Sequence, residues 1–305
     1  MKTTKQAVKV CNEIVTDRYA IYNGDCVDTL KGLPDGKVHY SIFSPPFSSL
    51  YTYSAHERDM GNCKNVDEFF AHFEFVIAEL MRVTMPGRLC SFHCMNLPSS
   101  KQRDGFIGIK DFRGQLIAAF QKHGWVYHSE VCIWKDPVTA MQRTKAKGLL
   151  YKQLKKDSCE SRQGIADYLV TMRKNAPNPE PVTKKGDRIK SSPDDFTIDM
   201  WQKYASPVWM DVDATKTLQS IREEKDERHI CPLQLDVIER AIRLWTNPND
   251  LVLTPFLGIG SEIYQAVKMG RRGIGIELKT AYFLQAAKNL KKAVAEIDQG
   301  SLFKN

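Results

Sequence analysis

Four consecutive residues, Ser44-Pro45-Pro46-Phe47, place a hydroxyl, a carbonyl and an aromatic ring next to one another. They follow an apolar run over residues 38–43 that predicts a buried strand. Two prolines cannot continue the hydrogen bonds of a strand, and proline holds the preceding residue in extended geometry. We therefore expect a rigid platform at the strand end that suits a flat, polar substrate such as a nucleobase. A strand that ends in a proline turn with a packed phenylalanine explains these four residues equally well.

A second stretch that could do chemistry is rich in glycine and lies near the end of the chain. A predicted strand leads into Gly258-Ile259-Gly260 and a helix, and the next strand ends at Glu277. Glycine lets the backbone approach a ligand closely, and an acidic residue at that strand end can accept hydrogen bonds from both hydroxyls of a ribose. A dinucleotide fingerprint needs a third glycine where Ile263 stands, and a phosphate-binding loop needs a following lysine. The pattern therefore favours a nucleoside without phosphates, namely S-adenosylmethionine.

The elements that must position these two stretches predict an α/β protein. Hydrophobic periodicity and helix start and stop signals alternate along most of the chain. Asp25, at the end of the first predicted strand, can accept hydrogen bonds from a ligand or cap the following helix, and its position leaves both roles open. After a polar lead-in, we expect strands over 19–23, 38–43, 88–95, 251–256 and 273–277, and one long strand or a strand pair over 125–134. We expect helices over 27–33, 65–84, 110–123, 232–245, 262–269 and 281–297.

Composition narrows the class of protein. The chain has 305 residues, enough for one large domain or two moderate ones. It has neither an apolar run of the roughly 20 residues that span a bilayer nor a signal peptide, so we expect a cytoplasmic protein. The eight cysteines form no Cys-x-x-Cys pair, and Cys90, His93 and Cys94 fall in a predicted strand whose alternate side chains face opposite ways. We therefore expect reduced thiols and no metal site there.

The region over 137–228 differs from the rest of the chain in its hydrophobic pattern. It shows little helix or strand periodicity, and the net charge of +8 for the whole chain indicates a polyanionic partner. Basic residues interleaved with isolated aromatic rings suit a nucleic-acid surface, although a solvated helix and a proline-rich linker explain any single cluster more simply. A surface loop before it carries two further aromatic rings. The residues that we expect to contact nucleic acid are Tyr51, Tyr53, Arg143, Lys145, Lys147, Lys152, Lys155 and Lys156.

Together, the two motifs resemble those of DNA methyltransferases that act on exocyclic amines, the N4-cytosine and N6-adenine group. The matching segments are Ser-Pro-Pro-Phe at 44–47, His-Ile-Cys-Pro-Leu at 229–233, Pro-Phe-Leu-Gly-Ile-Gly-Ser at 255–261 and Gly-Ile-Glu at 275–277. The catalytic motif precedes the cofactor motif, as in the permuted subgroup called beta. This order argues against protein-glutamine methyltransferases. Thr254 and Ile259 depart from the aspartate and serine that are common in the family, which could alter cofactor affinity.

The resemblance implies a Rossmann-like class I methyltransferase fold with a mostly parallel sheet, one antiparallel strand and helices on both faces. It divides the chain into a catalytic half over 1–136, a target-recognition insert over 137–228 and a cofactor-binding half over 229–305. It implies S-adenosylmethionine as cofactor and double-stranded DNA as partner, and leaves open a homodimer and a cognate restriction nuclease. The residues that it places at the cofactor are Asp25, Cys26, Cys231, Pro232, Phe256, Gly258, Gly260, Ser261 and Glu277.

The resemblance also assigns roles to the first motif. Ser44 Oγ and the Pro45 carbonyl would accept hydrogen bonds from the amine of a flipped base, and Phe47 would stack on its ring. Pro46 stiffens this platform, and transfer is direct, without a cysteine nucleophile. Serine in the first position favours N4 of cytosine, with N6 of adenine as the alternative. A non-catalytic nucleic-acid-binding protein on the same fold and an RNA substrate are further alternatives.

Overall fold

The chain folds around one large twisted sheet. The computed structural model describes residues 10–47, 59–144, 148–183, 196–218 and 232–302. Within these ranges, nine strands pair in the order β1-β2-β11-β10-β3-β4-β8-β7-β9, and β5 pairs with β6 in a separate ribbon. The strands are β1 (Asn12–Val15), β2 (Tyr19–Asn23), β3 (Val38–Phe43), β4 (Thr84–Met95), β5 (Leu97–Ser99), β6 (Gly108–Lys110), β7 (Trp125–Ile133), β8 (Asp167–Lys174), β9 (Val208–Trp209), β10 (Leu251–Thr254) and β11 (Arg272–Glu277).

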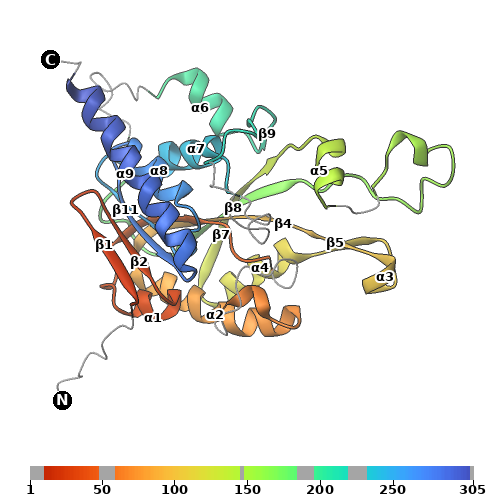
Figure 1. Cartoon of the computed structure of the whole chain (residues 1–305), viewed down its shortest axis with the longest axis horizontal. Coiled ribbons are helices and arrows are strands. Elements are labelled where there is room, and N and C mark those ends of the chain that lie inside the picture. Colours follow the sequence, from red (N-terminus) through yellow and green to blue (C-terminus); the bar gives the residue numbers. More distant parts are fainter. Residues whose placement is uncertain (1–9, 48–58, 145–147, 184–195, 219–231, 303–305) are drawn as a thin grey trace.

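Helices cover both faces of this sheet (Figure 1). On one face lie α1 (Cys26–Lys31), α2 (Val66–Val83) and α4 (Phe112–Lys122); on the other lie α7 (Leu235–Trp245), α8 (Ser261–Lys268) and α9 (Thr280–Leu302). The β5–β6 ribbon and the segment that follows α5 extend toward the same side of the molecule in this view. The remaining short helices are α3 (Lys101–Asp104), α5 (Pro137–Thr144), α6 (Ile198–Tyr204) and the single 3-10 turns η2 (Met60–Asn62) and η3 (Tyr151–Gln153).

Local sequence explains why the helices form where they do. Asn65 caps α2, because its side-chain oxygen accepts a hydrogen bond from the Glu68 N–H at 2.8 Å. Phe69, Phe73 and Ile77 then recur every four residues and are fully buried against the sheet. Helix α4 likewise has a polar N-cap and a stripe of buried apolar residues. The six predicted helices are confirmed, with ends that differ from the prediction by five residues at most.

Strand direction places the two motifs side by side. Strands β2, β11, β10, β3 and β4 are mutually parallel, and β1 and β8 run antiparallel to their neighbours. The connection from β3 to β4 passes through α2 on one face, whereas that from β10 to β11 passes through α8 on the other. The point between β3 and β10 is therefore a topological switch, and in such sheets ligands bind beyond the carboxyl ends of the strands at this point.

Two layers of core hold this arrangement. The aromatic side chains of α2 and α4 form one hydrophobic cluster under β3 and β4, and the helices α7, α8 and α9 form two further clusters on the opposite face. Full burial of an apolar side chain of this size contributes about 1.5–3 kcal/mol. Within the described ranges, no helix is long and apolar enough to cross a membrane.

The structure corrects the expectations in two places. Residues 137–228 were expected to lack regular structure, but β8 lies within them and pairs with β4 and β7 in the main sheet. The polar lead-in likewise contains β1, which pairs antiparallel with β2 at the sheet edge. The sheet thus has an antiparallel edge strand in addition to the one inner antiparallel strand that the methyltransferase fold implies. Residues 125–134, for which a strand pair or one long strand was open, form the single strand β7.

Candidate active site and cofactor site

The Ser-Pro-Pro-Phe motif begins where β3 ends. Ser44 is half-buried, and its Oγ lies 3.3 Å from Nδ1 of His93 on the neighbouring strand β4. Pro45 is buried, which fixes the direction of the chain. The half-buried Phe47 ring leans on Phe112 of α4, with ring centroids 6.4 Å apart and a tilt of 47°. The expected platform is therefore braced from both sides, by a polar contact at the hydroxyl and by aromatic packing at the ring.

The glycine loop follows β10, the strand next to β3. Gly258 and Gly260 have φ angles of 53° and 95°, in the left-handed region that favours glycine. A Cβ on Gly260 would lie 3.2 Å from the Cβ of Ala286 in α9, so this glycine is also needed for close packing. A Cβ on Gly258 would meet no described atom within 4 Å. The loop backbone is therefore open at Gly258, where a ligand can approach it.

Glu277 at the end of β11 supports this loop. One carboxylate oxygen accepts the Gly258 N–H at 2.7 Å, and the other accepts the Lys279 N–H at 2.8 Å. Burial raises the pKa of Glu277 to about 7, although the two N–H donors oppose the shift, and the nearby Asp59 adds to it. Each oxygen has a second lone pair for a ligand hydroxyl. The carboxylate is thus preorganised for a diol and is poorly stabilised in the absence of one.

The end of β2 completes this edge of the site. Asp25 caps α1, because its side chain accepts the Asp28 N–H at 3.0 Å. Asn23 is buried and donates from Nδ2 to the carbonyls of Glu277 and Leu278 at 2.9 and 3.1 Å. It thereby ties β2 to β11 and fixes the relative positions of Asp25 and Glu277. Asn23 was missed in the sequence because an asparagine at a strand end is an ordinary turn residue.

A pair of aromatic rings joins the two motifs directly. Phe43, the last residue of β3, and Phe256, in the glycine loop, have ring centroids 5.7 Å apart. Phe256 also stacks on Phe73 of α2, at 6.2 Å and 22°. Aromatic pairs of this kind contribute about 0.5–1.5 kcal/mol beyond the area that they bury. The distance between the substrate platform and the cofactor loop is therefore set by packed rings.

A polar chain behind Ser44 was not predicted. His93 Nε2 lies 3.1 Å from Oδ2 of Asp167, and Lys135 Nζ lies 2.5 Å from the same oxygen. Burial opposes the charge of Asp167, but His93 and Lys135 outweigh it and hold the pKa of Asp167 below its usual value. The available signal was a histidine inside a predicted buried strand, since buried polar residues are the informative exceptions. Its partner could not be identified without the pairing of β4 and β8.

The other predicted site residues fall into four groups. Cys26 is buried, which raises its thiol pKa far above the usual value and makes it a packing residue beside Asp25. Pro232 is half-buried just before α7, and the hydroxyl of the buried Ser261 at the start of α8 has no hydrogen-bond partner in the described ranges. Lys152, Lys155 and Lys156 are exposed, and Lys155 lies 5.8 Å from the ring of the exposed Tyr151. Tyr51, Tyr53, Lys145, Lys147 and Cys231 lie outside the described residues, and of Arg143 only the backbone, in α5, is described.

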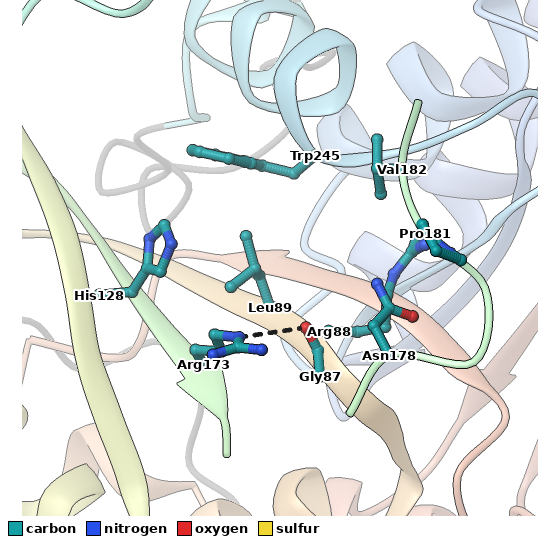
Figure 2. A pocket seen from close by; sticks show the side chains of 9 residues that line it. All are labelled: Gly87, Arg88, Leu89, His128, Arg173, Asn178, Pro181, Val182 and Trp245. Carbon is teal, nitrogen blue, oxygen red and sulfur yellow. Dashed lines mark hydrogen bonds between the residues drawn. The ribbon is translucent and has the colours of Figure 1, made fainter. Parts of the chain in front are cut away.

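A separate cavity lies at the opposite edge of the sheet (Figure 2). It has a volume of about 270 Å³ and is lined by residues that include Leu89 of β4, Arg173 at the end of β8 and Trp245 of α7. Leu89 is the first residue of β4 that pairs with β8. Because β8 runs antiparallel to β4, both strands reach the cavity at the amino ends of the parallel strands. The cavity is therefore far along the strands from Ser44 and Glu277 and does not belong to the site.

Comparison with known proteins assigns the family. The sequence profile of the N6- and N4-type DNA methylases, described as DNA methylase, matches residues 38–288. The match includes both motifs and every strand from β3 to β11. The chain therefore belongs to the DNA methylase family of the N6 and N4 type.

Individual relatives are more distant. The type II methyltransferase M.BamHI of Bacillus amyloliquefaciens is 25% identical over 267 residues, which are 86% of this chain and 55% of that protein. The chain spans between 22% and 60% of the length of the first three curated relatives that it matches.

Two solved structures share the fold. TTHA0409 of Thermus thermophilus, in complex with S-adenosyl-L-methionine, superposes with a TM-score of 0.65 at 20% identity and covers 92% of this chain and 95% of its own. The cytosine-N4-specific PvuII DNA methyltransferase gives a TM-score of 0.63 at 15% identity, with 94% of each chain covered. At these identities, the likeness establishes the methyltransferase fold alone.

Proposed function

We propose that this chain transfers a methyl group from S-adenosylmethionine to the exocyclic amine of a base in duplex DNA, with N4 of cytosine as the favoured target. The observation that carries this proposal is the position of the Ser44 motif at the end of β3, next to the strand β10 that leads into the glycine loop, in a member of the DNA methylase family. Both motifs are needed, because methyl transfer requires one site that holds the target amine and an adjacent site that holds the methyl donor.

The residues at the glycine loop fit S-adenosylmethionine. Gly258 leaves room for a ligand, Glu277 offers two oxygens to the ribose hydroxyls, and Asp25 lies at the neighbouring strand end. The buried Ser261 hydroxyl is a further polar group that a ligand could satisfy. When bound, the cofactor would supply a methyl group activated on a sulfonium. The chain's own residues would hold it with the methyl facing the platform.

The platform would make the target amine reactive by orienting it. An exocyclic amine is a poor nucleophile because its lone pair is delocalised into the ring. Hydrogen bonds from its two hydrogens to Ser44 Oγ and the Pro45 carbonyl favour the pyramidal form, in which the lone pair is free. Phe47 would stack on the flipped ring, and extrusion of the base costs a few kcal/mol. Catalysis on this view is mainly positioning.

The choice of cytosine over adenine rests on Ser44, the residue that the family pattern associates with N4-cytosine. We further propose that the exposed residues of the 137–228 region outside β8, among them Lys152, Lys155 and Lys156, contact the DNA backbone. These three lysines are exposed. The segment after α5, to which they belong, extends away from the main sheet in Figure 1.

The test is a methylation assay with the full chain. Methyl-labelled S-adenosylmethionine and a mixed duplex DNA library are incubated with the protein, and the DNA is digested to nucleosides. We expect labelled N4-methylcytosine. Labelled N6-methyladenine would show that the target base is adenine and not cytosine. The absence of label in both nucleosides would refute methyl transfer to DNA amines.

A serine variant tests the platform itself. Ser44→Ala removes one acceptor from an amine that becomes positively charged, which should lower kcat by about 10- to 100-fold. Calorimetry should show unchanged affinity for S-adenosylmethionine. Ser129→Ala is the matched control, because Ser129 also lies beside a histidine, at 2.9 Å from Nδ1 of His128, but outside the site. Equal losses in the two variants would contradict the assignment of Ser44.

A further inference from the structure

The polar chain behind Ser44 follows directly from strand register. Phe43 pairs with Phe92, so Ser44 comes next to His93 across β3 and β4. His93 pairs with Leu169 across β4 and β8, and Asp167 lies two residues earlier on β8. Because side chains alternate along a strand, Asp167 and His93 project from the same face of the sheet. Three strands thus bring a serine, a histidine and an aspartate into one line.

The order of these groups fixes the hydrogen-bonding pattern. The charge of Asp167 faces Nε2 of His93 at 3.1 Å, so the neutral imidazole carries its proton on Nε2. Nδ1 is then an acceptor, and Ser44 Oγ lies 3.3 Å away as the donor. With its hydrogen directed at His93, the serine hydroxyl presents its oxygen lone pairs to the substrate side. This is the state that an amine acceptor needs.

We propose that His93, supported by Asp167, is the positioning residue that fixes Ser44 as a hydrogen-bond acceptor and receives, through Ser44, the proton that the target amine must lose. The inference rests on the proposed function of Ser44. The same order of serine, histidine and carboxylate elsewhere in enzymes removes a proton from the serine as it attacks. Here the serine would not attack, and the proton would come from the substrate.

The proton balance is complete without any further reactant. The amine nitrogen forms a bond to the methyl carbon, the carbon–sulfur bond breaks, and its electron pair stays on sulfur. The nitrogen then carries a positive charge and releases one proton to Ser44 Oγ, while the Ser44 proton moves to Nδ1 of His93. The resulting imidazolium pairs with the Asp167 carboxylate and returns its proton to water after product release.

The surrounding charges are compatible with this role. The charged groups facing His93 are Asp167 from β8 and, beyond it, Lys135 after β7. Arg113 of α4 and Glu130 of β7 pair with each other at 2.7 Å. Oδ1 of Asp167 and Nε2 of His93 both lack a hydrogen-bond partner among the residues that the structure describes, although Nε2 lies 3.1 Å from Oδ2 of Asp167. A small rotation of the imidazole as the site fills would tighten both contacts.

The first test is spectroscopic and does not depend on turnover. Nitrogen NMR of the full chain with labelled histidine reports which ring nitrogen of His93 carries the proton. We expect protonation at Nε2 in the native chain, an Nδ1 shift in Ser44→Ala, and a change of tautomer in Asp167→Asn. A His93 that carries its proton on Nδ1 in the native chain would overturn the proposal.

The second test is kinetic. His93→Gln should lower kcat by about 100-fold, with calorimetric affinity for S-adenosylmethionine within about twofold of native. His128→Gln is the control, because His128 is an exposed histidine beside a serine outside the site. If His93→Gln fails to fold, Asp167→Asn replaces it, with the same expected loss of kcat.

The outcomes separate this inference from the proposed function. If the native chain methylates DNA and His93→Gln keeps the native kcat, the relay is wrong and the methyltransferase assignment stands. If the native chain methylates neither base, the proposed function fails, whereas the NMR tautomer still decides whether His93 orients Ser44.

Discussion

The pH dependence of cofactor binding is the sharpest prediction from the site, and it depends on Glu277. Burial raises the pKa of this carboxyl to about 7, so it changes charge near neutrality in the free protein. Ribose hydroxyls donate hydrogen bonds and therefore prefer the carboxylate. Binding should lower this pKa, release a proton near pH 7, and become tighter as the pH rises.

The size of the effect follows from the ionised fraction. With a pKa of about 7, about nine-tenths of the Glu277 side chains are charged at pH 8 and about one-tenth at pH 6. If only the carboxylate binds well, affinity falls by about tenfold over this range, or about 1.4 kcal/mol. Above pH 8 the affinity should level off.

Calorimetry of S-adenosylmethionine binding at pH 6, 7 and 8, in buffers of different ionisation enthalpy, measures both the affinity and the released proton. Glu277→Gln should bind S-adenosylmethionine weakly at every pH, and its affinity should no longer change between pH 6 and pH 8 through this side chain. Comparison with this variant also removes any titration of the ligand itself. Glu262→Gln is the matched control, because Glu262 is a buried carboxyl in the first turn of α8, beside the same loop, and burial raises its pKa to about 8.

Two results would refute this reasoning. One is a native affinity that stays constant between pH 6 and pH 8. The other is a pH dependence that survives in Glu277→Gln and disappears in Glu262→Gln, which would assign the titration to the helix α8 carboxyl.

Two further predictions concern the loop and the DNA surface. Gly260→Ala should lower the free energy of unfolding by about 1–3 kcal/mol in chemical denaturation, and by more than Gly270→Ala. Both glycines have positive φ, but only at Gly260 would the added Cβ also crowd Ala286. Equal losses in the two variants would show that packing against α9 is unimportant. Neutralising Lys152, Lys155 and Lys156 together should flatten the dependence of log affinity for DNA on log salt, by about 0.9 for each lysine that contacts a phosphate. The control is the triple variant of Lys288, Lys291 and Lys292, three exposed residues of α9, a helix that lies on the other side of the molecule from the segment after α5 in Figure 1. An unchanged slope in the first variant would show that Lys152, Lys155 and Lys156 are solvated and do not contact DNA.

Local patterns in the sequence were sufficient to predict most of the helices and strands. The strands that carry Ser44 and Glu277 are apolar runs ended by proline or by a charged residue, and both are confirmed as β3 and β11. The glycine loop was predicted because its positive φ angles require glycine in the sequence itself. The platform and the loop were placed together by the resemblance to the DNA methyltransferases, because the pairing of β3 with β10 joins segments that lie far apart in the sequence.

What the sequence could not provide was pairing between distant segments. Strand β8 lies in a basic, proline-punctuated region, and its burial comes from β4 and β7 on either side. Without that pairing, nothing in the sequence connects His93 to Asp167. The pKa of Glu277 was equally inaccessible, since it depends on burial and on the two N–H groups that the fold directs at it.

Strand β8 also limits how this protein could be re-engineered. A segment that contributes no strand or helix to the core of a protein can be exchanged between relatives as one block. Here the segment between β7 and α7 contributes an inner strand to the scaffold and the carboxylate behind Ser44. A chimera that replaced residues 137–228 as a block would therefore lose both the sheet and the active-site support. Two separate grafts, one before and one after residues 167–174, would preserve them.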